Sequence, residues 1–365
     1  MADLHPKAAR VLLIAPSLDI LGGQAVQATR LIEGLSRGDI TVDFQPINPS
    51  FPAPLKWVKK VPFLRTALTF SLYITQLAAR SWRYDILHVF SAGLSSFTLW
   101  TIPAMLIGRK LYGVKFILNY RDGQVEQHVR DWKTALPAIR AADVVISPSE
   151  YVVGILKKYG IKASAIFNVI DFTQFRYRQR SKLRPAFMTN RILEPLYNVG
   201  CILRAFAIVQ QSYPEASLTV AHDGVSRPGL EALAKELGLK NTKFIGRVPH
   251  TKVPELYDAA DIYLTSPDFD CMPGSLLECY ASGLPVIATR TGGIPFILRD
   301  GETGLLVECN DHAAMAEAAL RLLEDPALVE RLTRQGFGEL QKYDFEGGGI
   351  REKWLAVYRS LKPSA

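Results

Sequence analysis

Short apolar runs alternate with longer amphipathic stretches along almost the whole chain. The first run, Val11–Ala15, precedes Gln24–Leu35, whose apolar side chains recur on one helical face. Further strand-like runs follow, with helical patterns between them: Ile86–Phe90, Phe116–Leu118, Val144–Ser147, Ala165–Asn168, Leu218–Ala221, Lys243–Ile245, Ile262–Thr265 and Pro285–Ala288. Regular alternation of this kind is typical of parallel sheets covered by helices. The pattern therefore predicts an α/β protein.

The alternation is interrupted near Asp171. Residues 172–185 are rich in Arg and Gln and poor in apolar side chains, like a linker or a first loop, and the alternation restarts after them. A chain of 365 residues is also long for one core and suits two. We predict an N-terminal Rossmann-like domain over residues 1–171 and a second over residues 172–345. The last segment, 346–365, has apolar residues at helical spacing, and we expect this helix to pack back on the N-terminal domain.

Composition and cysteine spacing indicate a globular protein with free thiols. Hydrophobic residues make up 48% of the chain and charged residues 21%, which argues against disorder. The four cysteines form no CxxC or Cys/His metal spacing, so buried thiols in a reducing compartment are the favoured interpretation. Pro16 and Asp19 interrupt the first apolar run, which favours a buried strand over a signal peptide.

One uncharged stretch, Ile86–Gly108, is long enough to span a bilayer. It contains His88, a break at residues 91–93 and Pro103, and a strand, a loop and a buried helix account for these better than a membrane span. We interpret His88 as a satisfied core or solvent-edge histidine and assign it no catalytic role.

Charge is distributed unevenly between the two halves. Residues 1–200 hold 26 Lys and Arg against 13 Asp and Glu, whereas residues 201–365 hold 17 against 22. A basic first half suggests an anionic partner such as a membrane surface, a lipid phosphate or a nucleic acid. Cations and bulky apolar groups alternate just before the uncharged stretch Thr66–Ala79, as Lys56, Trp57, Lys59, Lys60 and Arg65. This region suits either a membrane interface or a solvated basic loop followed by a core helix.

Gly22-Gly23 lies between the first predicted strand and the first predicted helix. Two glycines let the backbone approach a ligand closely, and the N–H groups at a helix start attract phosphate. An ordinary turn explains the pair equally well. The pair is not the GxGxxG dinucleotide fingerprint, so it does not indicate NAD.

The densest group of polar candidates follows the predicted strand Ile262–Thr265. A polar loop leads into a short helix that opens at Ser275. Glu278 fits a capping box with Ser275, and a carboxylate near that helix start can also accept two bonds from a ribose diol. Asp268-x-Asp270 formally resembles a metal-binding pair, but acidic pairs are common in surface loops and we assign no metal.

The spacing of Asp270 and Glu278 resembles the donor-site motif of glycosyltransferase family 4, a retaining group with the GT-B fold. In that family an acidic residue, seven intervening residues and a Glu are followed by a short helix and a Gly-x-Pro-Val strand, as 283–286 reads here. Matching segments continue as TGGIP at 291–295 and DGETGLLV at 300–307. The resemblance covers nearly the whole chain and implies two Rossmann-like domains whose parallel sheets face a central cleft.

The resemblance also assigns roles to single residues. Arg191 would stabilise the donor diphosphate, and the backbone at Arg247 and Val248 would meet the base. Glu278 would hold the ribose and Asp270 the sugar hydroxyls. The remaining implied donor-site positions are Gly22, Gly23, Gly274, Ser275 and Leu276. The implied catalytic residues are Asp270, Arg121 and Arg191.

Three single positions depart from the family pattern, and the family's Gly-Asp-Gly-Pro becomes HDGV at 222–225. Tyr197 stands where the family has a Lys, so one cation for the diphosphate is lost. Arg121 stands where the family has a His, and an Arg can bind phosphate but cannot deprotonate as His does. Asp270 replaces a Glu and reaches one methylene less far.

The resemblance implies a metal-independent hexosyltransferase with no bound cofactor. It would use a UDP- or GDP-sugar and retain the anomeric configuration. The acceptor would be a glycan or a lipid-linked molecule in cell-envelope polysaccharide or glycolipid synthesis. The expected location is the cytoplasm, with peripheral contact to the anionic inner face of the cell membrane.

Other functions fit the same chain. A catalytically degenerate GT-B module that binds glycans or lipids would explain Tyr197 and Arg121. A sugar-nucleotide epimerase or hydrolase could use the same fold. A nucleic-acid binder is disfavoured, because the basic residues form no recognition motif or Arg-rich groove helix.

Overall fold

A computed structural model describes residues 9–17, 23–35, 40–51, 57–58, 61–91, 93–180 and 182–362. The chain divides into two compact units. Unit 1 comprises Met1–Val169 together with Phe345–Ala365, and unit 2 comprises Ile170–Asp344. The last part of the chain therefore belongs to the same unit as the first.

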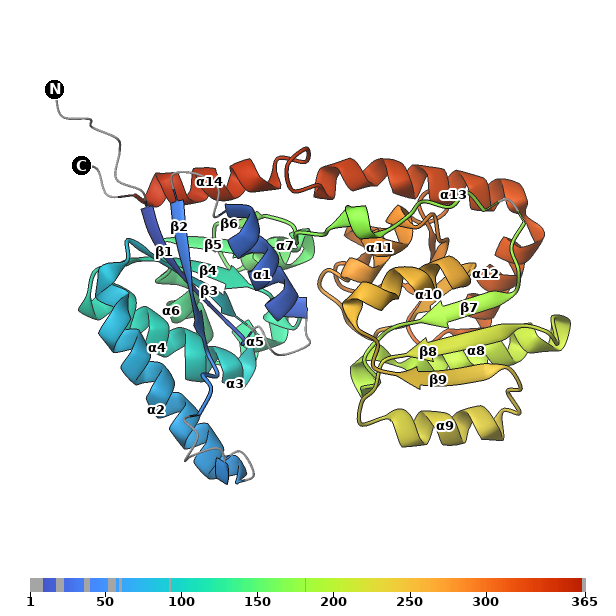
Figure 1. Cartoon of the computed structure of the whole chain (residues 1–365), viewed down its shortest axis with the longest axis horizontal. Helices are drawn as coiled ribbons and strands as arrows, with labels where there is room; N and C mark the ends of the chain where they lie inside the picture. The colour runs from blue at the N-terminus through green and yellow to red at the C-terminus, as the bar shows by residue number, and fades with distance from the viewer. Residues whose placement is uncertain are drawn as a thin grey trace. The chain divides into compact units, whose positions relative to one another are not determined.

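Unit 1 is built on a parallel sheet of six strands in the order β2-β1-β3-β4-β5-β6 (Figure 1). The strands are β1 (Ala9–Ala15), β2 (Ile40–Pro46), β3 (Ile86–Ser91), β4 (Lys115–Tyr120), β5 (Val144–Ser147) and β6 (Ala163–Ala165). The central strands β1, β3 and β4 are almost wholly buried. Near-continuous apolar runs are expected for parallel strands covered on both faces.

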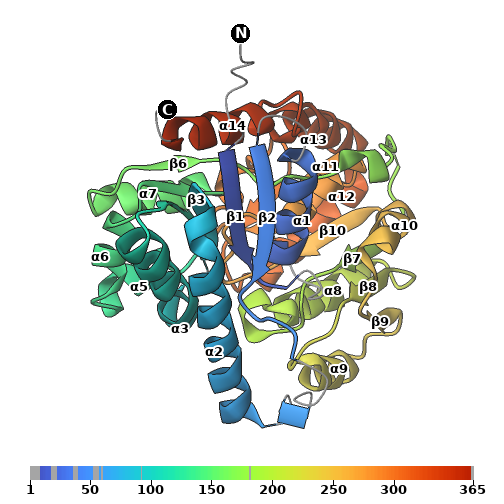
Figure 2. The ribbon, with the colours of Figure 1, turned by 60° about the vertical axis from the view of Figure 1, so that its left-hand side comes forward.

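Helices connect the strands of unit 1. They are α1 (Gly23–Leu35), α2 (Pro62–Arg80), α5 (Val125–Asp131), α6 (Ala135–Arg140) and α7 (Glu150–Lys158), and the C-terminal helix α14 (Ile350–Leu361) belongs to the same unit. A further helical segment over residues 94–111 comprises α3 (Leu94–Ser96), the π-helical η3 (Phe97–Thr101), α4 (Ile102–Met105) and the π-helical η4 (Leu106–Leu111). The helix α1 lies beside β1 and β2 in two views (Figures 1 and 2). No helix among the described residues is long and apolar enough to cross a membrane.

The C-terminal helix α14 completes the core of unit 1. Trp354, Tyr358 and Leu361 pack in one cluster with residues of β1, β3 and α1. The Tyr358 hydroxyl lies 2.8 Å from Nδ1 of His88, whose Nε2 lies 3.1 Å from the Asn119 amide. Burial, with a contribution from Arg121, lowers the pKa of His88 to about 3, so the imidazole stays neutral. The interpretation of His88 as a satisfied core histidine is confirmed.

Unit 2 is also built on six parallel strands, in the order β12-β11-β10-β7-β8-β9. They are β7 (Ala186–Thr189), β8 (Ser217–Ala221), β9 (Thr242–Gly246), β10 (Ile262–Thr265), β11 (Val286–Thr289) and β12 (Leu305–Val307). Its helices are α8 (Val199–Ser212), α9 (Arg227–Glu236), α10 (Val253–Ala259), α11 (Gly274–Ala281), α12 (His312–Glu324) and α13 (Pro326–Glu339). The strand order is that of a doubly wound Rossmann sheet.

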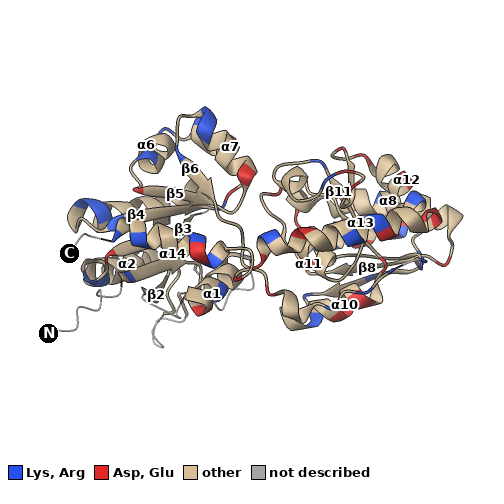
Figure 3. Cartoon of the chain, turned by 90° about the horizontal axis from the view of Figure 1, so that it is seen from above, with Lys and Arg blue, Asp and Glu red and all other residues tan. Residues whose placement is uncertain are grey.

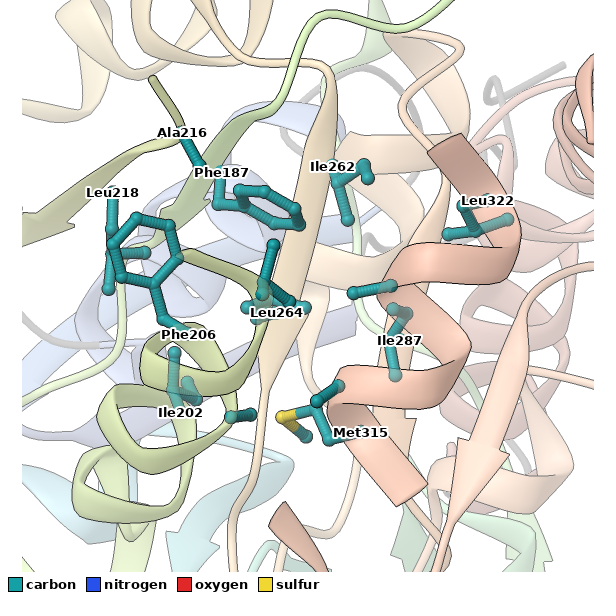
Figure 4. Packing of buried hydrophobic residues seen from close by; sticks show 14 of the residues in the cluster. Phe187, Ile202, Phe206, Ala216, Leu218, Ile262, Leu264, Ile287, Met315 and Leu322 are labelled. Carbon is teal, nitrogen blue, oxygen red and sulfur yellow. The ribbon is translucent and has the colours of Figure 1, made fainter. Parts of the chain in front are cut away.

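Large apolar side chains fill the space between this sheet and the helices α8 and α12. Phe187 and Leu264 project from the strands towards Phe206 of α8 and Met315 of α12 (Figure 4). Complete burial of one such side chain contributes roughly 1.5–3 kcal/mol to folding. Asp311 and Asp325 fix the starts of α12 and α13, because each accepts a hydrogen bond from a backbone N–H three residues on.

The prediction of an α/β protein with two parallel, Rossmann-like sheets is confirmed. Three strands lack a signal strong enough to predict them: β2, β7 and β12. The segment Ile86–Gly108 forms β3 followed by the helix of residues 94–111, as predicted, but the helix is only partly buried, with Leu99 and Leu106 exposed.

Candidate active site

The strand order of unit 2 defines a point where ligands bind in this type of sheet. The neighbouring strands β7 and β10 are the two from which the chain winds outward in opposite directions. Loops that leave the carboxyl ends of such strands diverge and leave room for a ligand. Asn190 and Arg191 follow β7, and the loop of residues 266–273 follows β10. The predicted residues Arg191 and Asp270 therefore lie at this switch point.

Arg191 and Asp270 form an ion pair. Both side chains are 13% exposed, and Nη1 of Arg191 lies 3.4 Å from the Ser275 hydroxyl. The ring of Tyr197 lies 4.4 Å from the guanidinium carbon, a cation–π contact. Tyr197, which stands where the family has a Lys, thus supports the remaining cation and adds no charge of its own.

The loop that carries Asp270 is supported by the segment 291–293. The Gly293 N–H donates to the Asp270 carbonyl at 2.8 Å, and the Thr291 hydroxyl donates to the Asp268 carbonyl at 2.8 Å. Within the loop the Met272 N–H donates to the Asp270 carboxylate at 3.2 Å. These bonds fix the backbone beneath the acidic side chain.

Glu278 does not form the predicted capping box. The helix α11 begins at Gly274, with Pro273 as its N-cap, so Ser275 lies inside the first turn and no side chain caps the helix. Glu278 lies one turn further along, where Oε1 is 3.1 Å from His250 Nε2 and Oε2 accepts from the Tyr257 hydroxyl at 3.0 Å. The capping interpretation is wrong, because the Pro273-Gly274 pair starts the helix before Ser275.

Asn190 and Tyr263 extend the hydrogen bonds of Tyr257 and Glu278. The Asn190 amide donates to the Tyr257 hydroxyl at 2.9 Å, and the Tyr263 hydroxyl donates to the Asn190 carbonyl oxygen at 2.7 Å. The sequence does not single out Tyr257 or Tyr263, because an aromatic residue at a buried helix or strand position has the pattern of an ordinary core residue.

The predicted base-binding backbone lies in the loop between β9 and η7 (His250–Lys252). Gly246 adopts a φ of +74°, Arg247 is exposed and Val248 is half-buried. His250 at the end of this loop contacts Glu278, so the loop passes beside the carboxylate. The helix start at Gly274, Ser275 and Leu276 follows directly from the acidic loop.

The arginine-rich residues 172–185 include a buried cluster. Arg180 is 2% exposed and donates to the carbonyls of Ser282 and Gly283 and to that of Tyr257, at 2.6–2.8 Å.

Arg178 and Arg184 donate to Asp261, which is 1% exposed. Burial alone raises the pKa of Asp261, but the hydrogen bonds from these arginines outweigh it and lower the pKa to about 2. The segment is therefore packed on unit 2.

The predicted catalytic residue Arg121 lies in unit 1, directly after β4. It donates to the side-chain oxygens of Asn119 and Asn168, and its guanidinium lies 4.5 Å from the centre of the Phe90 ring. Gly23 is the first residue of α1, and Gly22 lies outside the described residues.

The predicted membrane-side residues lie before and within α2. Trp57 is 58% exposed and Arg65 is exposed, whereas Lys56, Lys59 and Lys60 lie outside the described residues. Phe63 is 92% exposed at the start of α2.

The described residues include no group of three or more His, Cys, Asp or Glu side chains that could hold a metal ion. Asp268 accepts from the Asn198 amide at 3.1 Å, and Asp270 pairs with Arg191. All four cysteines are free thiols.

Two family models match successive parts of the chain. The model "Glycosyltransferase Family 4" matches residues 21–174, and "Glycosyl transferases group 1" matches residues 173–338. The sulfoquinovosyl transferase SQD2 of Arabidopsis thaliana is 27% identical over 319 residues, which are 81% of this chain and 60% of that protein. The matched segments span between 41% and 60% of the lengths of the first three curated relatives.

Solved structures share the fold. A sucrose-phosphate synthase from Thermosynechococcus elongatus has a TM-score of 0.79 at 20% identity, with 97% of this chain and 99% of that chain covered. The Anabaena protein HepE, solved with UDP and glucose, has a TM-score of 0.72 at 15% identity, with 96% and 99% covered.

Two parallel Rossmann-like sheets are the GT-B fold, which the solved structures share. Within this class, the two matching models together cover residues 21–338. The chain belongs to glycosyltransferase family 4.

Proposed function

We propose that the protein transfers a hexose from a UDP- or GDP-sugar to a glycan or lipid-linked acceptor in cell-envelope polysaccharide or glycolipid synthesis, with retention of the anomeric configuration. The observation that carries this proposal lies in unit 2, where Arg191 and the Glu278 carboxylate both occur near the switch point. A cation for the diphosphate and a carboxylate for the ribose are the groups that a nucleotide sugar requires. HepE, which shares the fold, was solved with UDP and glucose.

In the proposed reaction the bond between the anomeric carbon and the diphosphate oxygen breaks while a bond to the acceptor oxygen forms on the same face of the sugar. The acceptor proton moves to the departing phosphate oxygen. Arg191 and the N–H groups at the start of α11 stabilise the charge that develops on the diphosphate, so the proposal assigns no metal. Asp270 holds the sugar hydroxyls and also holds Arg191 until the donor binds.

In unit 1 we propose that Arg121 binds an anionic group of a substrate. Two asparagines and the Phe90 ring hold its guanidinium in one orientation. Arg121 cannot act as a base at neutral pH, which is consistent with a reaction in which the leaving group takes the proton.

Replacement of Glu278 with Ala tests the donor site. Titration calorimetry with UDP and GDP should show a loss of affinity of about 10- to 100-fold, because two hydrogen bonds to a charged group are removed. Glu255→Ala is the matched control, because Glu255 is exposed on the neighbouring helix α10 and pairs only with Lys252 among the described contacts. Equal nucleotide affinity in Glu278→Ala and the wild type would exclude the assignment.

A product assay separates transfer from the alternatives. Tyr197 and Arg121 replace a family Lys and His, and a degenerate binding module would explain both. An active transferase should release UDP or GDP from its donor in proportion to glycosylated acceptor. Nucleotide binding without transfer to any tested acceptor would favour the binding module.

We also propose a peripheral membrane contact on unit 1. The start of α2 is exposed around its circumference, and Phe63, Val61 and Leu64 lie there with Arg65. This end of α2 projects beyond the sheet of unit 1 (Figures 1 and 2). Apolar side chains beside cations suit an anionic membrane surface.

A further inference from the structure

The Glu278 carboxylate is held by two different elements. The Tyr257 hydroxyl, from α10, donates to Oε2 at 3.0 Å, and His250, from η7, lies 3.1 Å from Oε1. An ionised carboxylate only accepts hydrogen bonds, so the His250 ring carries its hydrogen on Nε2. Each carboxylate oxygen therefore has one donor of its own.

Tyr257 is the more rigid of the two donors. Its side chain is completely buried, and burial together with the Glu278 charge raises the pKa of its hydroxyl well above the usual value. The hydroxyl therefore keeps its proton. Asn190 donates to the same oxygen at 2.9 Å and accepts from the Tyr263 hydroxyl at 2.7 Å. Hydrogen bonds thus run in one direction, from Tyr263 through Asn190 and Tyr257 to Glu278.

This chain of bonds ends on a group that still has bonding capacity. A carboxylate offers about four acceptor positions, and Tyr257 and His250 use one on each oxygen. The Glu278 side chain remains 11% exposed, so the other positions are not wholly enclosed. Without fixed partners, the terminal torsion of a Glu side chain is broad and roughly two-fold.

We propose that Tyr257 and His250 are positioning residues that fix the plane of the Glu278 carboxylate, so that its two oxygens accept the two hydroxyls of a nucleotide ribose. This inference rests on the proposed function of Glu278 as the ribose-binding residue. A carboxylate that is already oriented gives tighter binding, because ordering a mobile side chain on binding costs part of the binding free energy.

Asn190 connects this network to the phosphate side of the site. It is the residue before Arg191 at the end of β7, so the amide that holds Tyr257 is adjacent in the chain to the guanidinium that pairs with Asp270. The residue that holds Tyr257 and the cation proposed for the diphosphate therefore both lie at the end of β7.

Binding of ribose and of dideoxyribose nucleotides tests the proposal. UDP and GDP, with their 2′,3′-dideoxy forms, are titrated calorimetrically into full-length wild type, Tyr257→Phe and His250→Leu, and neither replacement side chain can donate a hydrogen bond to Glu278. Loss of either donor should weaken binding of the ribose nucleotide about 5- to 10-fold, the effect of one hydrogen bond. Binding of the dideoxy nucleotide should change less than about twofold, because it makes no bond to Glu278.

Tyr280→Phe is the matched control. Tyr280 is a buried tyrosine on the same helix as Glu278, and its hydroxyl donates to Thr303 at 2.7 Å, away from the carboxylate. This variant loses a comparable buried bond and should bind both nucleotides as the wild type does. His250 is partly exposed, so His250→Leu tests the idea even where Tyr257→Phe unfolds.

The outcomes separate the two proposals. Equal weakening of the ribose and dideoxy nucleotides in both variants would overturn the positioning role while the donor site stands. Wild-type protein that binds neither UDP nor GDP would overturn the proposed function and this inference together. Selective loss of the ribose nucleotide supports both.

Discussion

Gly292 shows how closely the backbone packs around the acidic loop. It adopts a φ of +52°, and a Cβ built there would lie 2.2 Å from the Asp270 carbonyl oxygen. Any side chain at this position would therefore displace the backbone that carries Asp270. The preference for glycine here comes from both conformation and space.

We predict that Gly292→Ala lowers both stability and nucleotide affinity. Gly301 is the matched control, because its φ of +69° is similar and a Cβ there would have nothing within 4 Å. Gly301→Ala should cost about 1 kcal/mol of conformational strain alone. Gly292→Ala should cost at least 1–2 kcal/mol more in urea unfolding, as roughly expected where atoms overlap, and should weaken UDP or GDP binding. Equal costs for the two variants would show that the acidic loop tolerates the extra atom.

At the scale of single residues, the spacing of Asp270 and Glu278 is visible in the sequence, but the partners of these side chains are not. Ser275 stands three residues before Glu278, which suggests a capping box, whereas the true partners are Tyr257 and His250. Those partners lie 21 and 28 positions away, and only the tertiary structure brings Tyr257 of α10 and His250 of η7 to Glu278.

At the scale of elements, Arg180 links the ends of two helices of unit 2. Its guanidinium donates to carbonyls at the C-terminal ends of α10 and α11. A cation at two helix C-termini satisfies carbonyls that the helices leave free and offsets the partial negative charge there. Asp261 compensates the buried charge, with a carboxylate oxygen 3.5 Å from Arg180 Nε.

We predict that Asp261→Asn destabilises unit 2 by about 3–5 kcal/mol, because the substitution leaves Arg180 buried without a counter-charge. Asp258→Asn is the matched control. Asp258 pairs with Arg178 at 3.3 Å, but its side chain is 67% exposed, so the loss of this surface pair should cost less than about 1 kcal/mol. Chemical unfolding measures both, and similar values for the two variants would contradict a buried compensating role.

The same carboxylate predicts an acid dependence of stability. The folded pKa of Asp261 is about 2, below its ordinary value, so the unfolded chain binds the proton more readily at acid pH. The contribution of Asp261 to stability is therefore present above about pH 4 and is lost as the pH falls towards 2. In Asp261→Asn this part of the acid dependence should be absent.

At the scale of the whole molecule, the two units differ in charge (Figure 3) and in exposed apolar surface. Phe63 at 92%, Trp57 at 58% and Leu64 at 44% exposure all belong to unit 1, in a basic stretch of the sequence. Single exposed apolar residues are ordinary, but several next to cations mark an interaction surface.

We predict that the protein binds liposomes containing phosphatidylglycerol at low salt and that Phe63→Ser weakens this binding several-fold, because the side chain buries apolar area at the interface. Phe296→Ser is the control, since Phe296 is a Phe of unit 2 that is 54% exposed. Added salt should reduce binding by both proteins. Co-sedimentation measures the effect, and equal binding to neutral liposomes would argue against an electrostatic membrane contact.

The sequence by itself determined the class of fold and the family, because the alternation of apolar runs and the residues from Asp268 to Val307 depend on local spacing alone. It also placed Arg191, Asp270 and Glu278 among the candidates. Only the tertiary structure decided that Tyr197 stacks on Arg191, that Arg180 is buried against two helix ends, and that Tyr257 and His250 hold Glu278. These contacts join residues that are far apart in the chain, and a buried tyrosine or an arginine in a polar segment has the same local pattern whether or not it has such a partner.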